Sequence, residues 1–173
     1  MKNTLVCYPF AAVLRCGCRL LLLLALPVSG LSAQSQRDSL EQALPRATGS
    51  EKAEILYILS WEYRFSDKDK ALRYGEEGLR LGRSLHDTAA IAGSLNSLSE
   101  TYLNFGDYEK AEQITLEELP FARAQLPEAK NLLGALTRLG TIHYRQGRLD
   151  SALVYQLEVV REAEKIRKPE YVG

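Results

Sequence analysis

An eight-residue pattern occurs three times in this chain and constrains its fold more than any other feature. The copies are Leu56-x-x-Leu59-Ser60-x-x-Tyr63, Leu95-x-x-Leu98-Ser99-x-x-Tyr102 and Leu136-x-x-Leu139-Gly140-x-x-His143. A turn and an alanine follow each copy, and the alanines Ala71, Ala111 and Ala152 are 40 and 41 residues apart. A fixed period of this size predicts an all-α solenoid, in which each helical pair buries its apolar face only against its neighbours.

The first 33 residues have the order of a secretory signal peptide. Lys2, Arg15 and Arg19 precede or flank an apolar run at 20–28, and small residues end at Ala33. The run is shorter than the roughly 20 apolar residues that a membrane helix needs. We therefore expect an exported, periplasmic protein cleaved after Ala33. An uncleaved anchor stays open as an alternative because residues 4–14 are also apolar.

Composition excludes several classes of function for the exported part. All three cysteines lie in the leader, so neither a disulfide nor a thiolate metal site is expected after residue 33. Removing the three basic leader residues from 22 leaves 19 basic against 22 acidic residues, a net charge of −3. This slight acidity gives no support to binding of nucleic acid or of an anionic membrane.

Helical spacing divides the remaining chain into a lead-in segment at 34–50 and three helical pairs at 51–87, 88–126 and 127–167. The lead-in helix is expected at 38–44, where Pro45 closes it. Asp67 and Asp107 are placed to cap second helices, and Gly106 and Gly147 to take left-handed turn conformations. Pro120 predicts a kink in its helix or an early end at Leu119.

Residues 168–173 have the phase of the start of the second pair and are read as the beginning of an incomplete fourth repeat. Solenoids normally finish with a polar cap, and no such cap is present in this sequence. Two alternatives stay open. Either the chain is a fragment of a longer protein, or a partner or a second copy covers its C-terminal end. Membrane contact is expected only through an uncleaved leader or a missing downstream segment.

The eight-residue pattern, with the turn glycine and the alanine that follow it, resembles the tetratricopeptide repeat, whose pattern has Leu, a small residue, Tyr, Gly and Ala at the same offsets. The second and third copies match best, and the resemblance covers about residues 50–167. The family's aromatic residue four after the alanine is replaced by Gly75, Thr115 and Gln156. The resemblance implies a right-handed solenoid of about three helical pairs. The long period and the leader are also similar to the exported N-terminal repeat regions of Bacteroidetes-type sensor histidine kinases and regulators.

The family resemblance also implies a concave binding surface lined by the first helix of each pair. A protein or peptide partner is expected there, with aromatic and arginine side chains as anchors. Trp61 has a competing interpretation as a core residue beneath the lead-in helix. The candidate binding residues are Tyr57, Trp61, Arg64, Asn96, Glu100, Leu103, Thr137, Arg138, Thr141, Tyr144 and Arg145.

The sequence contains no pattern that predicts catalysis, a metal site or a cofactor. His143 takes the place of Tyr63 and Tyr102 and is expected to pack between helices, while His86 lies in a polar loop. No Glu-x-x-His or His-x-x-x-His spacing, glycine-rich phosphate loop or Gly-x-Ser-x-Gly motif is present. The expected function is therefore a non-enzymatic binding module, either the sensory part of a signalling protein or a free-standing scaffold.

Overall fold

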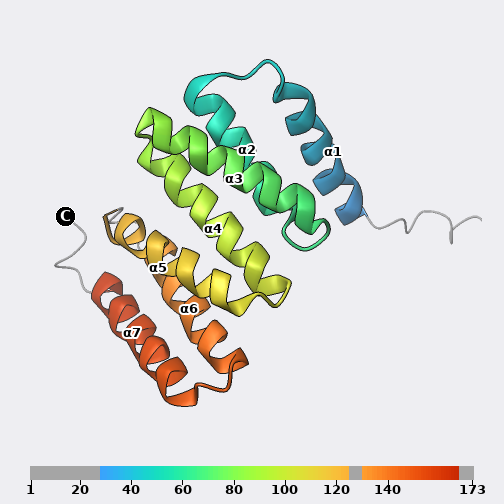
Figure 1. The fold of residues 1–173 in the computed structure, drawn as a ribbon. Helices are drawn as coiled ribbons and strands as arrows, with labels where there is room; N and C mark the ends of the chain where they lie inside the picture. The colour runs from blue at the N-terminus through green and yellow to red at the C-terminus, as the bar shows by residue number, and fades with distance from the viewer. Residues whose placement is uncertain (1–27, 125–129, 168–173) are drawn as a thin grey trace, which may run out of the picture. The chain divides into compact units, whose positions relative to one another are not determined.

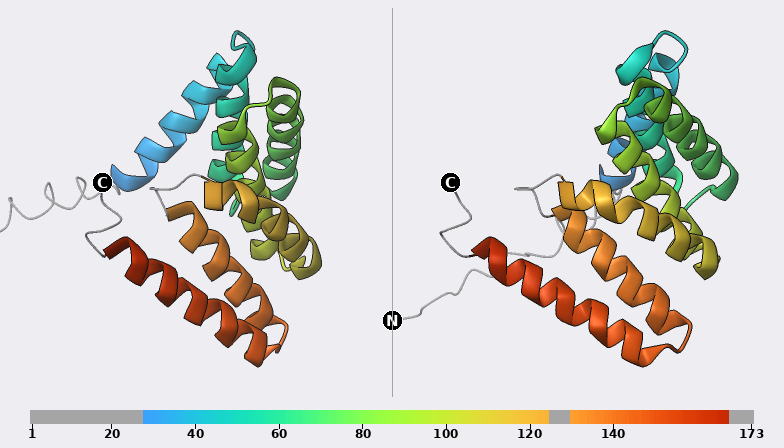
Figure 2. Two further views of the ribbon diagram at one scale, coloured as in Figure 1. Left: turned by 90° about the vertical axis from the view of Figure 1, so that its left-hand side faces the viewer. Right: turned by 60° about the vertical axis from the view of Figure 1, so that its left-hand side comes forward.

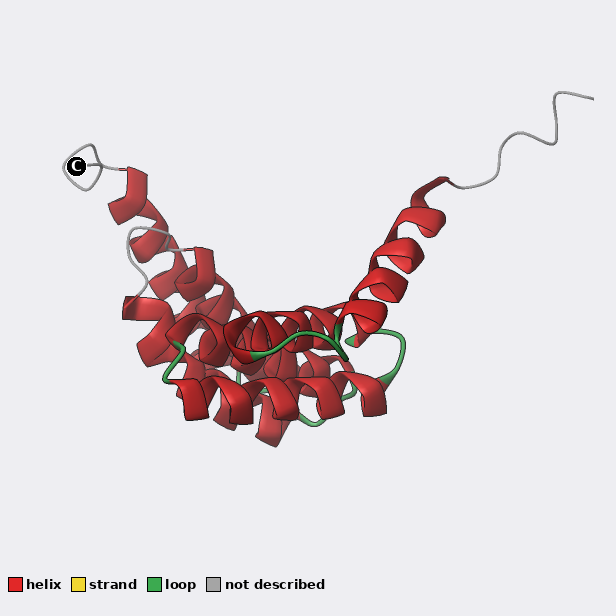
Figure 3. Cartoon of the chain, turned by 90° about the horizontal axis from the view of Figure 1, so that it is seen from above, coloured by secondary structure: helices red, strands yellow, loops and turns green. Residues whose placement is uncertain are grey.

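The computed structural model describes residues 28–124 and 130–167, and every element in this part is an α-helix (Figure 3). The helices are α1 (Val28–Ala43), α2 (Gly49–Tyr63), α3 (Lys68–Leu85), α4 (Thr88–Asn104), α5 (Tyr108–Ala124), α6 (Lys130–Arg145) and α7 (Leu149–Arg167). The chain divides into two compact units, residues 1–36 and 37–173. In the first unit only residues 28–36 are described, and they are helical.

The second unit is built from three helical hairpins in sequence, α2–α3, α4–α5 and α6–α7 (Figure 1). From α2 to α7 each helix packs against the next, and α2 also packs along α4. The corresponding contact between α4 and α6 is small. This arrangement confirms the predicted all-α, tetratricopeptide-like helical repeat with about three helical pairs.

The signature leucines form the core of each hairpin because they recur on one helical face. Leu56, Leu59, Leu95, Leu136 and Leu139 are completely buried, and Leu98 is nearly so. The small residues of the pattern occupy equivalent places in the first and third hairpins. A Cβ atom added to Gly75 would meet Ser60, and one added to Gly140 would meet Gln156; Gly75 and Gln156 each follow the repeat alanine by four residues.

Helix ends agree with the predicted turn chemistry. The Asp67 carboxylate accepts a hydrogen bond from the Lys70 backbone N–H at 3.0 Å, and Asp107 does the same for Lys110 at 3.3 Å. Gly106 and Gly147 have φ of 80° and 75°, the left-handed region in which a side chain is disfavoured. Asp87, which the sequence analysis did not single out, caps α4 through the Ala90 N–H at 3.0 Å.

Of the two alternatives predicted at Pro120, a kink or an early end at Leu119, the structure contradicts the early end. Helix α5 continues through Pro120 to Ala124. The lost backbone hydrogen bond is offset by packing beyond the proline, where Ala122 is 1% exposed and clusters with Leu132 and Leu136 of α6. Pro127 lies outside the described residues.

The predicted lead-in helix at 38–44 falls within α1, apart from Leu44, which lies just past its end. Leu40 and Leu44 pack against the core cluster of the first hairpin, which includes Ile55, Leu59 and Tyr74. The Glu41 carboxylate accepts hydrogen bonds from the hydroxyls of Tyr63 at 2.9 Å and Tyr74 at 3.1 Å. These contacts attach the lead-in segment to α2 and α3. Trp61 is not part of this cluster, so its interpretation as a residue beneath the lead-in helix receives no support.

The ends of the chain carry predictions that the structure does not address. The leader residues 1–27 and the start of a fourth repeat at 168–173 lie outside the described residues, and residues 28–33 belong to α1. The signal peptide, its cleavage and export therefore remain predictions. Within the described part of the chain, none of the helices combines the length and apolar character needed to cross a membrane.

Candidate peptide-binding site

The first helices of the hairpins carry the predicted binding residues, and the structure separates these residues into three groups. Tyr57 of α2 and Asn96 of α4 line a cavity of about 270 Å³, together with Gly93, Glu118 and Asn131. The Tyr57 ring lies directly against Gly93, because a Cβ atom there would be 2.9 Å from the ring carbons. The Ser97 hydroxyl donates to the Tyr57 carbonyl at 3.1 Å and joins α4 to α2. This cavity combines an aromatic face with amide and carboxylate groups.

Trp61 and Arg64 form a second group beside the first. The Arg64 guanidinium carbon is 3.7 Å from the centroid of the Trp61 ring and 4.4 Å from that of Phe65. Its Nη1 donates to the Trp61 carbonyl at 2.5 Å. Burial lowers the pKa of Arg64, and the negative charge of Glu100 opposes this shift. Both Trp61 and Arg64 are half-buried, so the pair presents a preformed cation–aromatic surface to solvent.

Arg138 was predicted to contact a ligand, and the structure corrects this. Its side chain is only 4% exposed and lies inside the interface of α4, α5 and α6. Nη1 donates to Oε2 of Glu118 at 2.7 Å, and Nη2 donates to Oδ1 of Asn96 at 2.5 Å. Nε is 3.4 Å from Oε1 of Glu100, an ion pair without a hydrogen bond. Arg138 therefore positions Asn96 and Glu100 from behind and is not available to a peptide.

Glu118 is the residue that the sequence analysis missed as a member of this site. It is 2% exposed, and burial raises the pKa of its carboxyl, while Arg138 opposes that shift. Glu118 occupies the position of Gly78 in the first hairpin, seven residues after the repeat alanine. A charged residue at a position that is otherwise small and buried needs a buried partner. The charged residue at this repeat position was the sequence feature that could have predicted a buried ion pair at Glu118.

The interface between the first and second hairpins differs from that between the second and third, because Glu118 stands where the first hairpin has Gly78. Cβ atoms built on Gly75, Gly78 and Gly82 of α3 would lie 2.7, 2.8 and 3.1 Å from atoms of Leu98, Ser94 and Ala90 of α4. The first two hairpins are therefore joined by close backbone approach. Between the second and third hairpins the Glu118–Arg138 pair fills this space, and α4 and α6 touch little.

The third group lies apart from the first two. Thr141 and Tyr144 line a different groove, which they share with Leu149, Leu153 and other residues of α7. Thr137 and Arg145 are exposed on α6. Leu103 is partly buried and packs against the cluster of Tyr102, Ala111 and Ile142. The predicted surface is therefore continuous only from Tyr57 to Glu100.

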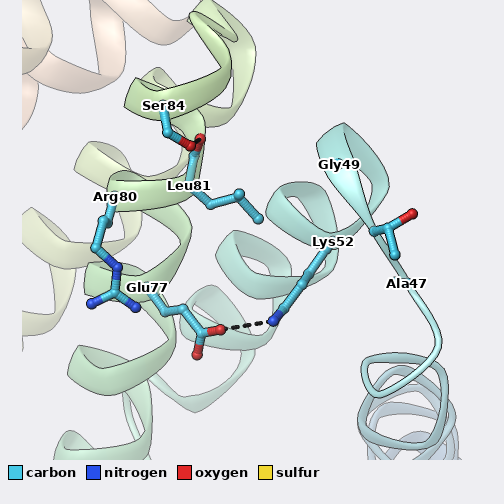
Figure 4. Close-up of a pocket in the computed structure, with 8 residues that line it drawn as sticks. Ala47, Gly49, Lys52, Glu77, Arg80, Leu81 and Ser84 are labelled. Atoms are coloured by element: carbon cyan, nitrogen blue, oxygen red, sulfur yellow. Dashed lines mark hydrogen bonds and ion pairs between the residues drawn. The ribbon is translucent and has the colours of Figure 1, made fainter.

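A larger cavity lies elsewhere in the first hairpin and was not predicted from the sequence. It has a volume of about 580 Å³ and is lined by residues of the loop before α2 and by side chains of α2 and α3 (Figure 4). Lys52 and Glu77 form an ion pair across it at 3.0 Å (Figure 4). Arg80 lines the same cavity (Figure 4).

Histidine and acidic side chains do not gather into a metal site in the part of the chain that the structure describes. His143 is 5% exposed and stacks on Tyr155 with ring centroids 5.1 Å apart, which confirms its predicted packing role. Burial lowers the pKa of His143, and Arg148 adds to this effect. Both effects favour the uncharged imidazole, while the nearby Glu112 opposes them.

Comparison with known proteins agrees with this helical-repeat fold. Residues 122–170 match the family model described as tetratricopeptide repeat, a range that covers the end of α5 and the whole third hairpin. The match supports a tetratricopeptide repeat protein. No curated protein matches the chain. No solved structure matches it either. Tetratricopeptide repeats generally mediate protein–protein interaction and are generally non-catalytic.

Proposed function

We propose that this chain is a non-enzymatic peptide-binding module whose site is formed by Tyr57, Trp61, Arg64, Asn96 and Glu100. The observation that carries the proposal is the stacked, half-buried Trp61–Arg64 pair beside the cavity that Tyr57 and Asn96 line. Tryptophan, tyrosine and arginine are enriched among the residues that supply most of the binding energy in protein interfaces, and tryptophan and tyrosine bury large areas with few rotatable bonds.

The chemistry of the surface favours a particular kind of peptide. Asn96 and Glu100 are held by Arg138, so their oxygen atoms are fixed before a ligand arrives. Glu118 pairs with Arg138, and Glu100 lies near both Arg138 and Arg64, so the two carboxylates are balanced by two guanidinium groups. A peptide that offers N–H donors to the cavity and an apolar or aromatic side chain to the Trp61–Arg64 pair satisfies these groups.

The module acts outside the cytoplasm in this proposal, as the periplasmic sensory or interaction part of a signalling protein. Support comes from the basic and apolar leader ending at Ala33. Expression of the chain with a C-terminal epitope tag and subsequent cell fractionation test the location. Recovery of the tag in the cytoplasmic fraction would contradict export.

A free-standing exported scaffold or assembly factor is the alternative. It is favoured by the large apolar side chains that α7 exposes, which suit packing against another protein. The coding sequence downstream of codon 173 distinguishes a signalling module from a scaffold. A membrane helix with an output domain encoded there supports the first, and a stop codon supports the second.

Selection from a displayed random peptide library, and then calorimetric titration of a selected peptide, tests the binding site. The double substitution Trp61→Ala/Arg64→Ala is expected to weaken binding at least about tenfold and to leave the helical circular dichroism unchanged. Tyr144→Ala is the matched control, because Tyr144 is 65% exposed and lies in the other groove. Equal affinity of the double variant and the wild type would refute the assignment. If the double variant loses helicity, Arg64→Glu tests the surface with Trp61 intact.

A further inference from the structure

His143 stands at a repeat position where the first two hairpins have tyrosine, Tyr63 and Tyr102. The surroundings of this position are alike in the first and third hairpins. The Tyr63 ring stacks on Tyr74 with centroids 6.1 Å apart, and the His143 ring stacks on Tyr155 with centroids 5.1 Å apart. Tyr74 and Tyr155 each follow the repeat alanine by three residues. The third hairpin therefore keeps the stacking of the first, but it holds a group that titrates near neutral pH.

A carboxylate of the preceding helix faces this position in both hairpins, but its partners differ. Glu41 of α1 accepts a hydrogen bond from the Tyr63 hydroxyl at 2.9 Å. Oε1 of Glu112 in α5 is 3.4 Å from Nε2 of His143 without a hydrogen bond, and the Glu112 carboxylate binds the Arg148 guanidinium instead. Among the described residues neither ring nitrogen of His143 has a hydrogen-bond partner, although the residue is only 5% exposed. A buried polar group without a partner is uncommon and calls for an explanation.

The groups around the His143 imidazole do not favour an added positive charge on it. Arg148, in the turn between α6 and α7, already occupies the one carboxylate that faces the ring, that of Glu112. Tyr155 of α7 stacks on the ring, and Tyr102 of α4 packs with the adjoining Ile142; neither brings a negative charge. Burial lowers the pKa of His143 below its ordinary 6.5, and Arg148 adds to this effect, whereas Glu112 opposes it. A proton on the ring is therefore held better when the helices around it separate and water enters.

The third hairpin is also the one with the smaller attachment to its neighbour. It joins the second hairpin mainly through α5 and α6, because α4 and α6 touch little (Figure 2). The first two hairpins are joined along two lines, α3 with α4 and α2 with α4. His143 of α6 and Glu112 of α5 face each other at the α5–α6 contact. Separation there exposes a smaller interface than separation of the first two hairpins would.

We propose that His143 makes the attachment of the third hairpin to α5 sensitive to acid. The uncharged imidazole permits the closed arrangement, and its protonation favours an arrangement in which the third hairpin opens and the imidazolium reaches water. Opening withdraws Arg138 from Asn96 and Glu100, which it holds in the closed arrangement. The consequence for a bound peptide rests on the proposed function, whereas the opening itself does not.

The direction of the pH dependence follows from where the proton binds more tightly. The pKa of His143 in the closed arrangement lies below 6.5, so the open arrangement takes up the proton first. The closed arrangement is therefore retained above about pH 6.5 and loses stability as the pH falls below it, until the closed ring is protonated too. Glu118 in the same interface acts in the opposite direction, because burial raises the pKa of its carboxyl. A variant that lacks only the histidine separates the two effects.

Hydrogen–deuterium exchange of the purified chain at pH 7.5 and pH 5.5, read by mass spectrometry, measures the opening without any peptide. After correction for the intrinsic effect of pH on exchange, protection of α6 and α7 is expected to fall at least about threefold at pH 5.5, while α2 and α3 keep theirs. His143→Tyr, which introduces the residue of the other two hairpins, is expected to abolish this fall. His86→Asn is the matched control, because His86 is exposed, is the other histidine of the chain, and has a φ of 54° that asparagine tolerates.

Arg148→Gln tests the part played by charge. It removes the cation that occupies Glu112, so the pKa of His143 measured by NMR is expected to rise and the acid-induced loss of protection to shrink. A merely structural role of Arg148 would instead lower protection equally at the two pH values. Equal protection of wild-type α6 and α7 at both pH values, or the same fall in His143→Tyr as in the wild type, would overturn the proposal. If His143→Tyr does not fold, His143→Phe supplies the residue that cannot titrate.

Discussion

Replacing Arg138 by methionine removes the cation that neutralises Glu118 inside the interface of the second and third hairpins. The two side chains are 4% and 2% exposed, and their nitrogen and oxygen atoms are 2.7 Å apart. At this separation and an effective dielectric constant near 20, the attraction is about 6 kcal/mol. Taking both charges out of water costs several kcal/mol for each ion, so the net contribution of the intact pair is small.

The single substitution is nevertheless expected to be severe, because it leaves the desolvated carboxylate without its partner. We expect Arg138→Met to lower the free energy of unfolding by about 3–5 kcal/mol at pH 7. The double variant Glu118→Leu/Arg138→Met is expected to recover most of this loss, since an apolar pair of similar volume incurs no desolvation cost. Asn96 and Glu100 lose a partner too, but both are half-buried and reach water.

The loss should depend on pH in a defined direction. Burial already raises the pKa of Glu118 above its ordinary value of 4.5, and removal of Arg138 takes away the effect that opposes this shift. A raised pKa means that the folded state holds the proton to a higher pH than the unfolded chain does. The variant is therefore most stable relative to the wild type below pH 4.5. It loses that stability as the pH rises through the folded pKa of Glu118.

Urea unfolding monitored by circular dichroism between pH 4.5 and 8 measures both effects. The wild type, the two single variants Arg138→Met and Glu118→Leu, and the double variant form a cycle that isolates the pair from other contacts. If Arg138→Met costs less than about 1 kcal/mol at pH 7, or if its loss does not grow with pH, the carboxylate is hydrated and the reasoning from burial fails.

Two further predictions concern the helices. Gly75→Val is expected to lower the free energy of unfolding by at least about 2 kcal/mol, because its Cβ atom would meet Leu98 at 2.7 Å. Gly134→Ala is expected to raise the free energy of unfolding by about 1 kcal/mol, because a Cβ atom there meets nothing within 4 Å. Thermal unfolding of the two variants checks this contrast, and equal effects would contradict it. Asp87→Ala is expected to cost about 1 kcal/mol at pH 7 through loss of the α4 cap. The hydrogen bond from the Ala90 N–H lowers the pKa of Asp87 below its ordinary 3.8, so the cap contributes fully above pH 3.8 and is lost as the pH falls through the folded pKa. In urea unfolding, the difference in free energy of unfolding between variant and wild type should therefore be smaller at pH 3 than at pH 7. An unchanged difference would rule out the capping carboxylate as its cause.

The hairpins and most of their ends were predictable from the sequence because they depend on local patterns. Leucine and alanine spacing defines which helical face is apolar, and aspartate and glycine define where the helices begin and end. The sequence also showed that Gly75 and Gln156 replace the family's aromatic residue four positions after the repeat alanine. Only the structure shows that these two residues face Ser60 and Gly140. At Pro120 the sequence left a kink and an early end both open, and only the structure shows that α5 continues to Ala124, which packs Ala122 with Leu132 and Leu136 of α6.

The chemistry between hairpins could not be read from local patterns, because it depends on residues that are far apart in the sequence. Arg138 meets Glu118 and Asn96, which are 20 and 42 residues away, and these contacts turn an expected ligand residue into a buried support. The same limit applies to Thr141 and Tyr144, which were predicted on one binding surface with Tyr57 and which instead line a separate groove with α7. The periodic apolar pattern therefore specified the helices and their order, whereas the tertiary structure decided which polar groups are buried together and which faces reach solvent.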